Sequence, residues 1–159
     1  YLGDVPLQDA VKQLVESMGL STEQSVKFAE DFMIVDQKKA PMVLCEVKSS
    51  SKDVKDKHLV DVERHILEND LELGFPSLLI VNTRMDANSL KEKDAPVPPK
   101  IVKQARNRGI LAMRTLDLIR AYAANKEGTL PRDKLLELFK TKAGWLKVNK
   151  DGRIEVPES

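Results

Sequence analysis

Cysteine and histidine are scarce in this sequence, which has one Cys, Cys45, and two His among its 159 residues. A single cysteine excludes an internal disulfide framework, and so few soft ligands argue against a structural zinc site. Chains without disulfides are typical of reducing compartments, so we expect a cytoplasmic setting. No apolar run approaches the roughly 20 residues that span a bilayer, so no membrane partner is expected.

The N-terminal residues 1–4 lack the basic and apolar stretches of a signal peptide. Since the first residue is Tyr1 rather than Met, we expect the chain to be a domain of a longer protein. Its length is that of one ordinary domain, and its composition, 42% hydrophobic and 32% charged, is typical of a globular fold.

An excess of charge of one sign is also missing, since the formal net charge is only +1. The basic residues are nevertheless unevenly placed. Residues 48–57 hold four Lys against two Asp, and residues 100–120 hold six basic residues against one acid. Such stretches form either solvated faces or surfaces that face a polyanion, and the sequence leaves both interpretations open.

Two short apolar runs predict a buried β-hairpin. Residues 32–35 (FMIV) and 42–47 (MVLCEV) are largely apolar on both faces, which is typical of strands inside a sheet. The polar segment between them, closed by Pro41, predicts the turn. We therefore expect two antiparallel strands in the interior of the sheet.

Downstream of the hairpin, helical and strand patterns alternate. Apolar spacing predicts helices over residues 7–18, 58–71 and 100–108, the last ended by Gly109, and another capped by Thr115 and running to about residue 125. Short apolar runs predict strands at 76–82 and 110–113, with a polar loop over 83–99. Strand, helix and strand in this order imply right-handed crossovers and parallel pairing.

The C-terminal segment differs in character. A short helix is predicted from Pro131 to about residue 141, and the runs 145–148 and 153–156 flank a hairpin turn. We therefore predict an α/β fold with a mixed central sheet flanked by helices over residues 1–125. Residues 126–159 are expected to form a small helix and hairpin appendage, packed on that domain or linked to it.

The motif Glu46-Val47-Lys48 ends the second strand of the predicted hairpin. Residues two apart on a strand share a face, so the two charged side chains point the same way. Buried charges are costly unless they are paired or bind a metal. We therefore expect the two charged side chains at the end of this apolar strand to contact an oppositely charged group or a metal ion.

Asp31 is the partner that the hairpin supplies. If residues 37–40 form the loop, the register sets Asp31 opposite Glu46 and leaves Asp36 at the turn. Opposed Cβ atoms are about 4.5–5.5 Å apart, and two carboxylates so close repel unless a cation lies between them or one is protonated. A slip of one residue would send Asp31 to the other face, so the choice of Asp31 over Asp36 depends on this register.

Two carboxylates so placed suit a hard divalent cation, Mg²⁺ or Mn²⁺. Lys48 stands about 6.6 Å farther along the same face than Glu46, where its ammonium could position a water for attack on a phosphate and stabilise charge on the phosphoryl oxygens. A plain ion pair of Lys48 with Glu46 or Asp31 explains the same spacing equally well. Both interpretations stay open.

The sequence around these residues resembles the PD-(D/E)XK phosphodiesterases, the restriction-endonuclease-like superfamily. The resemblance rests on residues 29–35 (AEDFMIV) and 43–50 (VLCEVKSS), followed by a helix, an apolar strand ending at residue 82, a second helix, Gly109 and the strand 110–113. It covers roughly residues 5–125 and implies a restriction-endonuclease-like fold. It also implies a metal-dependent nuclease activity.

The resemblance implies a role for each matching residue. Asp31 and Glu46 correspond to the two acids that bind the metal, and Lys48 corresponds to the catalytic lysine. The backbone carbonyl of Val47 corresponds to a further metal ligand.

Two helical positions depart from the family's pattern. Several members carry a glutamate on the first helix, where this chain has Gln8 and Asp9, and many carry a glutamine on the helix after the lysine, where it has Arg64 and His65. Arg64 or His65 could contact the scissile phosphate, or either could be a surface residue. These departures leave a degenerate, non-cleaving member as an alternative.

Several side chains outside the motif have interpretations of their own. Cys45 faces away from Glu46 and is expected to pack in the core, and Trp145 is expected to anchor the tail rather than stack on bases. His58 and His65 lie seven residues apart on one face of a predicted helix. They could be metal ligands, but the favoured interpretation is that both face solvent. Nucleic-acid contacts are expected from Lys52, Arg64, His65, Lys100, Lys103 and Arg106.

The sequence thus favours a nuclease domain that depends on Mg²⁺ or Mn²⁺ and acts on nucleic acid, with DNA preferred to RNA. Other domains of a longer restriction, repair or defence protein are expected partners, and a homodimer is an open alternative. A catalytically degenerate nucleic-acid-binding or assembly domain of the same fold is the second hypothesis. A small-molecule enzyme of unrelated α/β type is weaker, because no Gly-rich phosphate loop or nucleophile elbow is present.

Overall fold

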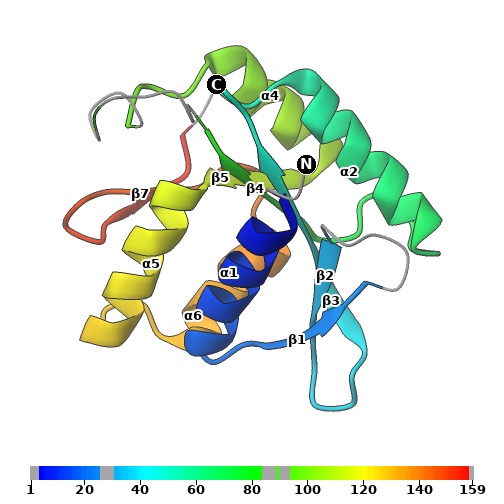
Figure 1. Ribbon diagram of the computed structural model, residues 1–159, viewed down its shortest axis with the longest axis horizontal. Helices are drawn as coiled ribbons and strands as arrows, with labels where there is room; N and C mark the ends of the chain where they lie inside the picture. The colour runs from blue at the N-terminus through cyan, green and yellow to red at the C-terminus, as the bar shows by residue number, and fades with distance from the viewer. Residues whose placement is uncertain (1–3, 26–30, 84–88, 90–93, 158–159) are drawn as a thin grey trace.

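A central sheet with helices on both faces forms the core of the protein, as the computed structural model shows (Figure 1). The structure describes residues 4–25, 31–83, 89 and 94–157. Within these ranges it contains a six-stranded mixed sheet, five helices and a separate two-stranded ribbon. The predicted α/β class with a mixed sheet is therefore confirmed.

The six strands follow one another across the sheet in the order β1-β2-β3-β4-β5-β6. Neighbours are antiparallel from β1 to β3 and parallel from β3 to β6, as the alternation of strands and helices predicts. The strands span Ser21–Gln24 (β1), Asp31–Val35 (β2), Pro41–Ser49 (β3), Ser77–Asn82 (β4), Ile110–Arg114 (β5) and Gly144–Trp145 (β6).

The helices divide between the two faces of the sheet. One face carries α1 (Asp4–Ser17), α5 (Thr115–Glu127) and α6 (Arg132–Thr141), and the other carries α2 (Asp56–Glu68) and α4 (Pro99–Arg108) (Figure 1). Each face has its own buried apolar cluster. Among the residues that the structure describes, none of the helices has both the length and the apolar character of a membrane span.

The two central strands of the hairpin alternate between these clusters. Cys45 and Val47 of β3 pack against the α1, α5 and α6 side, whereas Leu44 packs against the α2 and α4 side. Burial, reinforced by the nearby Asp31 carboxylate, raises the pKa of the Cys45 thiol well above its usual value. Cys45 is thus the neutral packing residue that the strand pattern predicted.

The hairpin has the register that the sequence predicted. Asp31 pairs with Glu46, and the register shifts only near the turn, where Val35 pairs with Pro41. The strand β1, which borders β2, was not predicted, because its four residues, STEQ, are polar and mostly exposed. An edge strand of this kind has no apolar alternation to reveal it.

Several helix ends differ from the prediction. The first two helices begin earlier than predicted, α1 at Asp4 rather than residue 7 and α2 at Asp56 rather than residue 58. The second helix stops at Glu68 rather than residue 71, because the Asn69 side chain donates to the His65 carbonyl and Asp70 adopts a left-handed conformation with φ 60°. At the start of α5, the capping residue is Arg114 rather than Thr115. The Asp117 carboxylate accepts the backbone N–H of Arg114 at 3.0 Å.

The C-terminal residues complete the main sheet as well as forming a ribbon. Gly144 and Trp145 form β6 beside β5, and Trp145 is fully buried in the cluster under α2 and α4. The predicted hairpin is confirmed only for β7 (Lys147–Val148) and β8 (Ile154–Glu155). Trp145 is a core anchor, as predicted, but of the central sheet rather than of the tail.

Candidate metal centre

Asp31 and Glu46 lie side by side in the interior of the molecule. Asp31 is the first residue of β2 and Glu46 is its cross-strand partner in β3. Both side chains are 0% exposed. They project on the same side of the sheet as Leu44, so they face α2 and α4. The predicted pairing of the two acids is therefore confirmed.

His65 joins the two acids from the helix that covers them. Its Nδ1 atom lies 2.9 Å from Oδ2 of Asp31 and 3.3 Å from Oε1 of Glu46, and its side chain is 1% exposed. One ligand atom from each of the three residues lies within 4.8 Å of the others. This acid–histidine group, Asp31, Glu46 and His65, could hold a metal ion.

Lys48 adds a cation at the edge of the acid–histidine group. Its Nζ lies 3.3 Å from Oε1 of Glu46, and its side chain is 20% exposed. Lys48 therefore lies between the buried acids and the solvent. The ion pair between Lys48 and Glu46, which the sequence left open as an alternative, is therefore present.

The sequence prediction that His58 and His65 face solvent is wrong. With Val62 they form a buried stripe on α2, spaced four and three residues apart, and that stripe faces the sheet. Asn69 holds the C-terminal end of the helix by donating its side-chain N–H to the His65 carbonyl at 2.8 Å. The spacing of His58, Val62 and His65 is present in the sequence, and it could have been used to predict that both imidazole rings face the interior of the protein.

Arg64, by contrast, is the surface residue that the alternative interpretation expected. Its side chain is 55% exposed and lies near Asp61 and Glu68 on the same helix. One guanidinium nitrogen, Nη2, lies 3.3 Å from Nε2 of His65. Arg64 thus touches the outer edge of the ring whose inner edge faces the acids.

A chain of two hydrogen bonds links the first helix to the backbone of Asp31. Gln8 of α1 is buried and donates to Oε1 of Gln24 at 2.9 Å. Gln24 of β1 donates to the backbone carbonyl of Asp31 at 2.7 Å. Asp9 is exposed and takes no part in these two bonds. Gln8, one of the two positions nearest to the glutamate that the resemblance expected, is therefore an amide that supports the backbone of Asp31 through Gln24.

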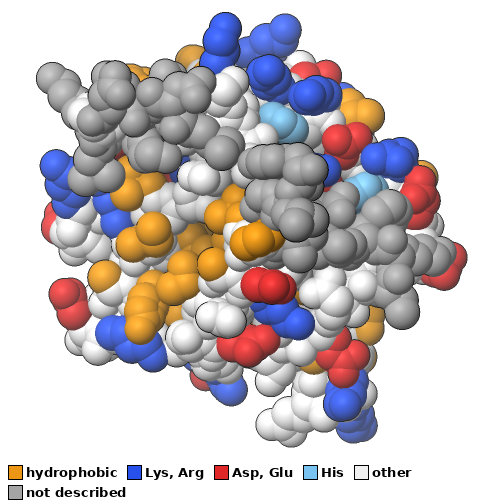
Figure 2. All heavy atoms as spheres, in the orientation of Figure 1, with side chains coloured by type: hydrophobic (Ala, Val, Ile, Leu, Met, Phe, Trp, Pro, Cys, Tyr) orange, Lys and Arg blue, Asp and Glu red, His pale blue; other side chains and the backbone are white. Residues whose placement is uncertain are grey.

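The residues predicted to contact nucleic acid fall into two groups. Lys52, Lys100 and Lys103 are exposed, as Arg64 is. Arg106 is half-buried and donates to the carbonyl of Pro157 at 2.6 Å, and His65 is buried against the acids rather than open to a surface ligand. Figure 2 shows Lys and Arg side chains gathered over the region of α4 and the start of α2.

No family model, curated protein or solved structure matches this chain.

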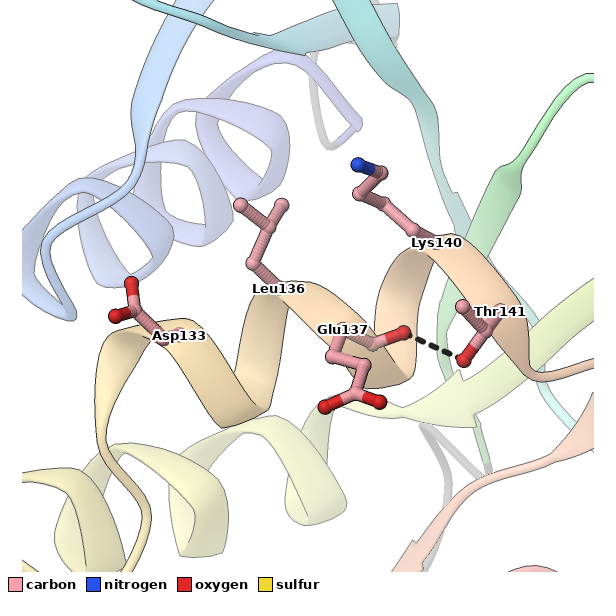
Figure 3. A pocket seen from close by; sticks show the side chains of 5 residues that line it. All are labelled: Asp133, Leu136, Glu137, Lys140 and Thr141. Atoms are coloured by element: carbon pink, nitrogen blue, oxygen red, sulfur yellow. Dashed lines mark hydrogen bonds between the residues drawn. The ribbon is translucent and has the colours of Figure 1, made fainter.

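A hollow in the molecular surface lies along α6, and no member of the candidate metal centre lines it. Figure 3 shows its lining, and the hydroxyl of Thr141 donates to the Glu137 carbonyl at 2.7 Å there. Its volume is about 300 Å³. Its lining residues are Asp133, Leu136, Glu137, Lys140 and Thr141. No member of the acid–histidine group borders it, so the candidate chemistry does not lie in this hollow.

The pKa of His58 is lowered from its usual value of about 6.5, first by burial and then by the charges of Lys57, Lys48 and Lys55. Its Nδ1 atom accepts the backbone N–H of Lys55 at 3.0 Å, which requires a neutral nitrogen there. The fold therefore prefers neutral His58. Stability linked to this residue is present above pH 6.5 and is lost as the pH falls toward the lower pKa of the folded state.

We expect His58→Gln to flatten the pH dependence of stability between pH 7.5 and 5.5. Glutamine keeps an acceptor for Lys55 but cannot gain a proton. One proton per chain limits the difference in slope to about 1.4 kcal/mol per pH unit. Urea unfolding at a series of pH values measures this slope, and equal slopes for the wild type and the variant would refute the assignment.

Proposed function

We propose that this chain is a metal-dependent phosphodiesterase, a nuclease domain of restriction-endonuclease-like type that acts on DNA in preference to RNA. The observation that carries the proposal is the pairing of Asp31 with Glu46, with Lys48 on the same face of β3. Strand geometry brings together two acids and an ammonium, which are the groups that metal-assisted phosphate chemistry needs.

The donor set fits a divalent ion. Two buried carboxylates at cross-strand distance repel each other, and a cation between them would relieve this repulsion. Oxygen ligands suit Mg²⁺ and Mn²⁺, and the Val47 carbonyl is proposed as a further ligand from the same strand. When bound, the ion would supply Lewis acidity toward a phosphoryl oxygen and lower the pKa of a coordinated water.

Each side chain has its own part in the proposed reaction. Asp31 and Glu46 would hold the ion. Lys48 reaches toward solvent, where its ammonium would orient the attacking water and stabilise negative charge that builds on the phosphoryl oxygens. Gln8 and Gln24 act at a distance from the reacting atoms, by fixing the backbone at Asp31.

A basic surface beside Lys48 supports a polyanionic substrate. Lys55 and Lys57 lie at the start of α2, and their charges, together with that of Lys48, lower the pKa of His58 on the same helix. Exposed lysines of α4, Lys100 and Lys103, belong to the helix that packs against α2. Such a cluster attracts phosphates without regard to base sequence.

A degenerate, nucleic-acid-binding domain of the same fold is the second candidate. The observation that favours it is the burial of the acid–histidine group, because a substrate phosphate must reach a catalytic ion directly. The contact of His65 with both acids also satisfies them in part without any metal. In this alternative the basic surface binds nucleic acid and the buried group stabilises the fold.

A cleavage assay with matched glutamate variants separates the two candidates. Single- and double-stranded DNA and RNA are incubated with the wild-type chain in Mg²⁺ or Mn²⁺. We expect metal-dependent cleavage, which Glu46→Gln lowers by at least about 100-fold because the ion loses a charged ligand. Glu23→Gln, on the exposed strand β1, should leave the rate unchanged.

Wild-type protein that binds nucleic acid with a steep salt dependence, yet cleaves none of these substrates with either ion, would favour the degenerate domain instead.

A further inference from the structure

The acid–histidine group contains one nitrogen donor in a set that the sequence expected to be all oxygen. His65 aims Nδ1 at both carboxylates, at 2.9 Å from Asp31 and 3.3 Å from Glu46. Carboxylate and carbonyl oxygens suit Mg²⁺, whereas imidazole suits the divalent transition ions. The presence of His65 therefore bears on which ion the centre would select.

The spacing of the three donors suits a single ion. Neighbouring ligands around an octahedral ion at about 2.1 Å are about 3.0 Å apart. The two distances from Nδ1 are close to that value, and the ligand atoms of the three residues all lie within 4.8 Å of one another. Because all three side chains are buried on regular elements, β2, β3 and α2, little rearrangement is needed to bind an ion.

Ion binding at His65 would require the side chain of Arg64 to move. A metal-binding Nδ1 leaves the ring proton on Nε2, and Nη2 of Arg64, itself a donor, lies 3.3 Å from Nε2. Two donors cannot face each other at that distance, so Arg64 must turn away. Its exposed side chain already has Asp61 at 3.4 Å and Glu68 at 3.8 Å as alternative acceptors.

We propose that His65 is the third protein ligand of this centre and makes it select divalent transition ions, with Mn²⁺ as the reference, over Mg²⁺. This inference rests on the metal centre of the proposed function. It adds to that function the identity of a third ligand and the class of ion that the centre selects. The imidazole nitrogen stabilises a bound transition ion more than a bound Mg²⁺, whereas Asp31 and Glu46 contribute to both.

The test compares the only two histidines of the chain. Binding of Mn²⁺ and of Mg²⁺ is measured by calorimetric titration for the wild type, His65→Gln and His58→Gln. We expect His65→Gln to weaken Mn²⁺ binding at least about 10-fold and to change Mg²⁺ affinity by less than about threefold. His58→Gln, a change at a buried histidine of the same helix, should leave both affinities as in the wild type.

Pulsed electron paramagnetic resonance of Mn²⁺ bound to the wild-type chain gives a second measurement that needs no variant. A histidine nitrogen coupled to the ion is expected, and it should persist in His58→Gln. An unchanged Mn²⁺ to Mg²⁺ preference in a folded His65→Gln variant, or the absence of nitrogen coupling, would overturn the proposal.

These readouts are independent of cleavage. Mn²⁺ held by His65 without any hydrolysis would support this inference and remove the proposed activity. Cleavage supported equally by both ions, without nitrogen coupling, would keep the activity and remove His65 as a ligand.

Discussion

Asp31→Asn should abolish the stabilisation that a divalent ion gives to the fold. An ion that binds only the folded chain, at about 100 times its dissociation constant, adds about 2.7 kcal/mol to the free energy of unfolding. For a chain of this size that corresponds to a rise in Tm of about 5–10 °C. Asparagine keeps the size and an acceptor for His65 but removes the charge that holds the ion.

Thermal unfolding with and without saturating Mn²⁺ measures this effect. The matched control is Asp36→Asn, at the turn of the same hairpin, where the side chain accepts backbone N–H groups of Lys38 and Ala40. This control should keep the full rise in Tm. An equal rise in Asp31→Asn would show that the stabilising ion binds elsewhere.

Lys48→Met should lower the rate of phosphodiester hydrolysis by about 100- to 1,000-fold, the effect typical of losing one group that stabilises charge in the transition state. Methionine keeps most of the length of the side chain and removes the ammonium. Since Lys48 pairs with Glu46 but brings no ligand, the affinity for Mn²⁺ should stay within about threefold. Loss of rate with retention of the ion separates a catalytic lysine from a structural one.

Lys52→Met is the control for charge alone, because Lys52 is exposed and lies outside the acid–histidine group. It should weaken nucleic-acid binding slightly and leave the rate at saturating substrate unchanged. If both variants lost the same small factor, Lys48 would be one more cation of the basic surface and not a catalytic group.

The pairing of Asp31 with Glu46 was predictable because a strand repeats every two residues. A short loop closed by Pro41 fixes the register of the hairpin, and a register fixes which side chains face each other. Once Glu46 points to one side of β3, Lys48 must point there too. The part of the candidate centre that depends on local geometry alone could therefore be derived from the sequence.

The place of His65 could not be derived with the same security. Its inward orientation depends on how α2 is rotated about its axis over the sheet. Its neighbours Arg64 and Ile66 point in different directions, one outward and one into the core. The polarity of His65 favours the surface, whereas its place on one helical stripe with His58 favours the interior. The contacts of His65 with the two acids show that it lies in the interior.

Other parts of the fold depend on contacts between distant segments. The strand β1 is polar and short, and it exists because β2 offers an edge for pairing. The strand β6 has two residues, and Trp145 belongs to the main sheet because β5 lies beside it. Neither pairing has a periodic signal in the sequence.

Anomalous diffraction from crystals soaked in Mn²⁺ tests the metal centre most directly. The expected result is one strong peak bounded by the carboxylates of Asp31 and Glu46 and by Nδ1 of His65. Nη2 of Arg64 should then lie farther from Nε2 of His65 than the present 3.3 Å. If crystals at saturating Mn²⁺ show no peak there and the imidazole of His65 still contacts Asp31, the proposal that these three residues bind a metal is wrong.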